Sequence, residues 1–75
     1  MSIAKNLKFL RKKAGYTQEQ FAKELGIKRS LVGAYEEGRA EPRLQNLSKI
    51  SKVLNVTVDG LIVGDQTILK SIKFQ

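Results

Sequence analysis

The chain has no cysteine, no histidine and no tryptophan among its 75 residues, and it has a single proline. Without thiols and imidazoles it cannot form disulfides, bind zinc through thiolates, use a cysteine nucleophile or carry out histidine acid-base catalysis. We therefore expect no metal ion, no cofactor and no catalytic residue. Acidic residues are also few, seven against 14 Lys and Arg, which gives a formal net charge of +7. This excess indicates a polyanionic partner, nucleic acid before an anionic membrane surface.

A chain of 75 residues forms at most one small domain, because a chain this short buries only about 60% of its unfolded surface. The hydrophobic fraction of 41% is enough for a small core. Apolar runs are short and charges interrupt the N-terminus, so no membrane span or signal peptide is indicated. We expect a cytoplasmic protein with a folded domain over residues 1–65. Residues 66–75 alternate imperfectly and are interpreted as a tail, a dimerisation segment or the start of a downstream domain.

Two apolar stretches in the first third of the chain have helical spacing, and each is followed by glycine. The first covers about residues 2–14 and precedes Gly15, which suits the left-handed conformation at a helix end. Thr17 and Gln20 then form a capping-box pattern, in which each side chain bonds the backbone of the other. This pattern predicts the start of a second helix, which Gly26 ends.

A third apolar stripe, Leu31, Val32 and Tyr35, begins only a few residues after the second helix and stops at Gly38. Two short helices joined by a three- or four-residue turn that contains glycine are typical of a helix-turn-helix. The spacing therefore predicts this motif for the second and third helices.

Two more helices are predicted after a loop around Pro42. The fourth covers residues 44 to about 55, and the fifth is capped by Thr57 and closed by Gly64. The chain as a whole is predicted to be all-α with five helices.

Two segments of the chain resemble the Cro/repressor (Xre-type) helix-turn-helix family of phage repressors and bacterial regulators: RKKAGYTQEQFAKELGIKRSLVGAYEEGRAEP and LSKISKVLNVTVDGLI. The resemblance covers roughly residues 3–64 and rests on a series of features at matching spacings. It implies a five-helix lambda-repressor-like DNA-binding domain, in which the second helix crosses the DNA backbone and the third lies in the major groove. It also implies a transcriptional regulator, expected to be a repressor, that binds double-stranded DNA.

The resemblance further implies that the first turn of the third helix points at base edges. Base contacts are expected from the positions opposite the apolar stripe, which are Lys28, Arg29, Ser30, Gly33 and Ala34. Arg29 is the one side chain among them that can bind guanine in a bidentate manner. For Arg29 the alternatives are a phosphate contact or a solvated charge. Gly33 and Ala34 are expected chiefly to allow the helix to approach the DNA closely.

Phosphate contacts and one structural ion pair are carried over from the family in the same way. Gln18 matches the start of the second helix, where a side chain and free amides meet a phosphate. Arg39 and Arg43 lie in the loop that contacts the DNA backbone in family members. Arg11 and Glu36 match a partly buried ion pair that joins the first helix to the end of the third. For each residue, an ordinary solvated side chain is the alternative.

The family pattern also sets expectations for partners. One five-helix body reads only about 4 to 6 base pairs, so we expect a homodimer on a near-palindromic operator. Lys28 and Arg43 stand where the family often has a capping hydroxyl, and both are poor N-caps. An antitoxin-like or other protein-interaction module with secondary DNA binding is the alternative function. The sequence identifies no small-molecule effector.

Overall fold

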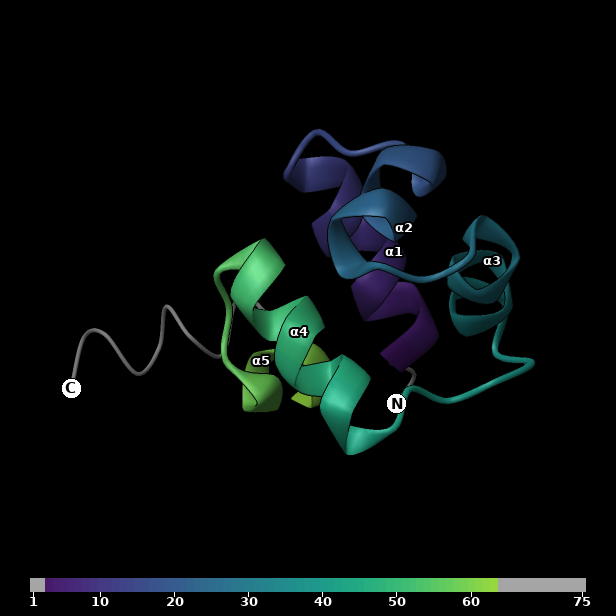
Figure 1. Ribbon diagram of the computed structural model, residues 1–75. Helices are drawn as coiled ribbons and strands as arrows, with labels where there is room; N and C mark the ends of the chain where they lie inside the picture. The colour runs from purple at the N-terminus through teal and green to yellow at the C-terminus, as the bar shows by residue number, and fades with distance from the viewer. Residues whose placement is uncertain (1–2, 64–75) are drawn as a thin grey trace, which may run out of the picture.

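The computed structural model describes residues 3–63 of the chain. Over this range the chain forms five helices: α1 (Ile3–Lys13), α2 (Gln18–Leu25), α3 (Arg29–Glu37), α4 (Leu44–Leu54) and α5 (Val58–Val63) (Figure 1). The predicted all-α, five-helix fold is therefore confirmed. The expectations for residues 66–75, and for closure of α5 by Gly64, lie outside the described residues.

Local signals in the sequence fix where α2 and α3 begin and end. The Thr17 hydroxyl accepts from the Gln20 amide at 3.0 Å, and the Gln20 side chain accepts from the Thr17 amide at 3.0 Å, which completes the predicted capping box. Gly26 ends α2 at φ +72° and Gly38 ends α3 at φ +78°. Left-handed backbone costs other residues roughly 1–2 kcal/mol, so glycine at these two positions sets the helix lengths.

The N-termini of α3 and α4 lack side-chain caps. Lys28 and Arg43 are the N-cap residues, and neither makes a capping hydrogen bond, as their residue types predict. The first amides of a helix have no partner inside it. Both helix starts therefore present unpaired backbone donors beside a positive side chain.

One hydrophobic core unites the five helices. Each helix contributes one fully buried side chain: Leu7, Phe21, Val32, Ile50 and Leu61. Helices as short as α2 and α5 are marginal in water by themselves. Their stability therefore comes from this shared core more than from helix propensity.

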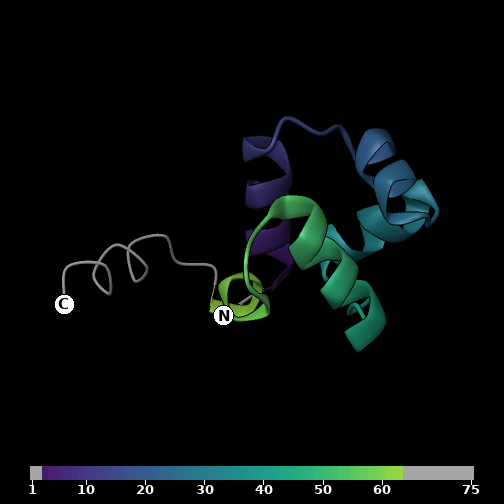
Figure 2. The same cartoon turned by 60° about the vertical axis from the view of Figure 1, so that its left-hand side comes forward.

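The packing leaves one side of α3 uncovered. α1 packs against both α3 and α5, while α2 packs against α3 and α4. In Figure 1, α3 lies at one edge of the molecule, away from α5. Figure 2 shows α5 beside the first half of α1, where the Asn6 amide donates to the Leu61 carbonyl at 2.8 Å. No helix within residues 3–63 has the length and apolar character needed to cross a membrane.

Candidate nucleic-acid interface

The exposed face of α3 carries three residues spaced four apart: Arg29, Gly33 and Glu37. Successive residues rotate by 100° around a helix, so each residue of this series is turned by about 40° from the one four positions before it. The three residues therefore lie on one broad face. Arg29 and Glu37 are exposed and Gly33 is half-buried, while Val32 and Tyr35 on the opposite side are in the core. α3 therefore presents a polar outer face over its full length.

Gly33 sits in the middle of this face, and the fold of the chain does not explain it. Its backbone is helical rather than left-handed, and a Cβ added there would meet nothing within 4 Å. Glycine inside a helix costs roughly 1 kcal/mol relative to alanine. The missing side chain leaves the α3 backbone open to close approach by another molecule.

Ala34 was expected on the same exposed face, and this expectation is wrong. Its side chain is buried, with 8% of its surface exposed. The amides of Arg39 and Ala40 both donate to the Ala34 carbonyl, at 2.9 and 3.3 Å. These two bonds cap the C-terminal end of α3. Helical spacing alone does not reveal that the Ala34 side chain is buried.

A shallow cleft connects α3 to the start of α2. It is lined by Arg11, Thr17, Gln18, Glu19 and Arg29. The N-terminus of a helix attracts anions through its free amides and its dipole. Because Arg29 borders this cleft and also stands on the outer face of α3, the two features form one continuous surface.

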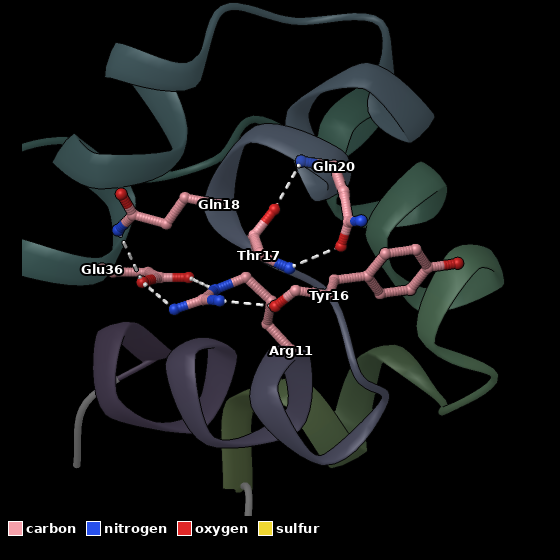
Figure 3. Close-up of polar contacts among 6 residues, drawn as sticks. All are labelled: Arg11, Tyr16, Thr17, Gln18, Gln20 and Glu36. Carbon is pink, nitrogen blue, oxygen red and sulfur yellow. Dashed lines mark hydrogen bonds and ion pairs between the residues drawn. The ribbon is translucent and has the colours of Figure 1, made fainter.

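Arg11, which lines the cleft, forms a buried ion pair with Glu36 (Figure 3). Arg11 Nε donates to Glu36 Oε2 at 2.5 Å and Nη2 donates to Oε1 at 3.1 Å. The two side chains are 7% and 2% exposed. Arg11 Nη1 also donates to the Tyr16 carbonyl at 2.6 Å. The structure brings together the two residues expected to pair, and it joins α1 to the end of α3.

Gln18 belongs to the same network, which the sequence did not indicate. Its Nε2 donates to Glu36 Oε1 at 3.0 Å, so one carboxylate is shared by Arg11 and Gln18 (Figure 3). In residues 3–63, every buried polar side-chain atom has a hydrogen-bond partner. The network therefore fixes α1, the start of α2 and the end of α3 relative to one another, with its polar groups satisfied.

The remaining predicted contact residues lie at the start of α3 and in the segment between α3 and α4. Lys28, Ser30, Arg39 and Arg43 are exposed. Arg39 Nε also donates to Glu37 Oε1 at 2.7 Å, and the two side chains are 64% and 61% exposed. The expected site residues did not include Glu37. Its position four residues after Gly33 was the signal that could have placed it on the same face of α3.

A further contact that was not predicted joins α3 to α4. The Asn46 side chain donates to the Tyr35 hydroxyl at 2.8 Å. Because Tyr35 is otherwise buried in the core, this bond satisfies its polar end and links the two helices.

Known proteins share both the sequence pattern and the fold. The helix-turn-helix family HTH_3 matches residues 7–61. The uncharacterized HTH-type transcriptional regulator YonR of the Bacillus subtilis SPbeta prophage is 45% identical over 83% of this chain and 57% of its own length. The Bacillus subtilis transcriptional regulator ImmR is 38% identical over 95% of this chain and 56% of its own length. The chain thus spans a little over half the length of these curated relatives.

A solved structure gives a comparison that covers almost the whole chain present in that structure. The P22 c2 repressor, in complex with a synthetic operator, superposes with a TM-score of 0.81 and 28% identity. The match covers 87% of this chain and 98% of the repressor chain.

Proposed function

The chain belongs to the helix-turn-helix family, and from this membership we propose that it binds double-stranded DNA sequence-specifically as a transcriptional regulator, with α3 in the major groove. The observation that carries the proposal is the outer face of α3, where Gly33 leaves open space between exposed polar residues. A helix can enter the major groove, where each base pair has its own pattern of donors and acceptors. The structure of the similar P22 c2 repressor in complex with a synthetic operator supports the proposal.

In this proposal the first turn of α3 reads the bases. Arg29 contacts guanine, Lys28 and Ser30 contact neighbouring base edges or phosphates, and Gly33 lets the helix backbone lie close to the DNA. The exposure of the three side chains supports this assignment. Ala34 is left out because it is buried.

Phosphate contacts would fix the orientation of α3 in the groove. Gln18 has one amide hydrogen bonded to Glu36, which leaves its second hydrogen and the first amides of α2 for a phosphate. Arg39 and Arg43 provide positive charge after α3. The cleft that Gln18 shares with Arg29 supports a phosphate next to the base that Arg29 reads.

The biological assignments follow from DNA binding. Two copies would bind a near-palindromic operator with half-sites about 34 Å apart, and repression requires only that the bound dimer occupies the promoter. In this proposal the chain binds DNA without catalysing a reaction, and it acts in the cytoplasm, where bacterial and phage DNA lies.

Selection from a random pool of DNA duplexes tests the proposal. We expect enrichment of one near-palindromic sequence. For each tenfold rise in salt concentration, the binding constant should fall by about 0.9 logarithmic units per neutralised phosphate. The variant Arg29→Ala should lower the affinity for the selected sequence. Lys23→Ala serves as control, since Lys23 is a cation that lines a separate cleft beside Gly15. If no sequence is enriched and binding does not depend on salt, DNA binding is contradicted and a protein-interaction module is favoured.

A further inference from the structure

One acidic side chain stands on the face of α3 that the proposed function places against DNA. Of the two glutamates in α3, Glu36 is buried in its ion pair, whereas the Glu37 side chain is 61% exposed. A carboxylate repels phosphates whatever the sequence, so Glu37 lowers the attraction of this basic domain for all DNA. Such a group increases selectivity if it meets a hydrogen-bond donor at the correct sequence.

The position of Glu37 along α3 matches the spacing of base pairs. Glu37 follows Arg29 by eight residues, which corresponds to about 12 Å along the helix axis, or three to four base-pair steps of about 3.4 Å. Gly33 lies midway between them and has open space outside it. Close approach at Gly33 brings the longer side chains on both sides of it towards the floor of the groove.

The chemistry of the carboxylate restricts what it can meet there. An ionised carboxylate only accepts hydrogen bonds. The donors in the major groove are the amino groups of cytosine and adenine, and glutamate suits N4 of cytosine. On its major-groove edge guanine presents only acceptors, and thymine presents an acceptor and a methyl group. The backbone phosphates also only accept hydrogen bonds, so none of these groups can donate to the carboxylate.

Arg39 bonds one of the two oxygens of the carboxylate. Its Nε bonds Glu37 Oε1 at 2.7 Å, and within residues 3–63 no protein donor bonds Oε2. Glu37 therefore retains a free acceptor atom. The charge of Arg39 also offsets the repulsion between Glu37 and nearby phosphates.

We propose that Glu37 is a specificity-determining residue that accepts a hydrogen bond from N4 of a cytosine, three or four base pairs from the base that Arg29 reads. This inference rests on the proposed function, because it requires the outer face of α3 to lie in the major groove.

The test compares base preferences of wild-type protein, Glu37→Gln and Glu37→Ala on the selected duplex, with every position replaced in turn. Wild type should prefer dC at one position by about 5- to 150-fold. Glu37→Ala should lose this preference and keep all others. Glu37→Gln should shift it towards dA, because a glutamine amide pairs with N6 and N7 of adenine. Glu24→Gln, which removes an exposed charge from α2, is the matched control and should leave every preference unchanged.

The outcomes separate this inference from the proposed function. If both Glu37 variants bind all duplexes more tightly by the same factor, with base preferences unchanged, Glu37 acts only by general repulsion and the inference is wrong. Selective binding by wild type with no cytosine preference in this region overturns the inference and leaves the proposed function intact. Failure of wild type to select any sequence overturns both. Thermal melts monitored by circular dichroism verify that the exposed substitutions leave α3 folded.

Discussion

Removal of the buried carboxylate of Glu36 should strongly destabilise the domain. In Glu36→Ala the guanidinium of Arg11, 7% exposed, loses both bonds to the carboxylate and keeps its bond to the Tyr16 carbonyl. Breaking a buried pair from one side typically costs about 3–5 kcal/mol, because a charge stays buried without compensation. Stability of about 0.05–0.15 kcal/mol per residue gives a 75-residue chain roughly 4–11 kcal/mol. The variant should therefore lose a large part of its stability.

Replacing both partners by apolar residues should recover most of this loss. The double variant Arg11→Met and Glu36→Leu leaves no buried charge, and such replacements are often neutral or stabilising. The Tyr16 carbonyl and the Gln18 amide lose their partners. Both residues are partly exposed and can bond water instead, so we expect the double variant within about 2 kcal/mol of wild type.

Urea denaturation followed by circular dichroism measures these differences. The double-mutant cycle consists of wild type, Arg11→Met, Glu36→Leu and the double variant. We expect a coupling of about 2–4 kcal/mol between Arg11 and Glu36. The exposed pair of Arg39 and Glu37 is the matched control, and its coupling should stay below about 1 kcal/mol. A coupling near zero for the buried pair, or equal couplings for both pairs, would refute the reasoning that burial makes the difference.

Three further predictions concern the DNA surface and the end of the chain. Gly33→Ala should raise the free energy of unfolding by about 1 kcal/mol and yet weaken DNA binding, whereas unchanged affinity in anisotropy titrations would mean that no DNA approaches there. Arg29→Ala should reduce the preference for one base pair by about 1–3 kcal/mol. Arg43→Ala should weaken binding to all DNA sequences alike and reduce the slope of log affinity against log salt concentration by about one unit. Equal losses on all sites would make Arg29 a phosphate contact. Deleting residues 66–75 should reduce cooperative binding to paired half-sites without loss of helical circular dichroism, and unchanged cooperativity would locate the dimer contact elsewhere.

The helices could be predicted because their signals are local. The capping box of Thr17 and Gln20 and the glycines after α2 and α3 act on the backbone within one turn, and the apolar stripes mark the buried faces. Asn55 was not predicted as a left-handed residue, although it ends α4 at φ +58°. Asparagine tolerates this conformation but does not require it, so its signal is weaker than that of glycine.

The site was less predictable because it depends on how segments meet in space. Helical spacing identified the outer face of α3, and family resemblance identified the pairing partners Arg11 and Glu36. Neither indicated that Ala34 is buried, or that Gln18 shares the Glu36 carboxylate. Both depend on how separate helices pack together, and the periodicity of a single helix contains no information about that packing.

The two adjacent glutamates at the end of α3 show how burial decides the role of one residue type. They point about 100° apart, so Glu36 meets the core while Glu37 meets solvent. The buried pair is costly to break and holds α3 against α1 and the start of α2. The exposed pair contributes at most about 1 kcal/mol, so its bonds can be exchanged for DNA contacts at little cost. Substitution of Glu36 should therefore change stability first, whereas substitution of Glu37 should change which DNA sequence is bound.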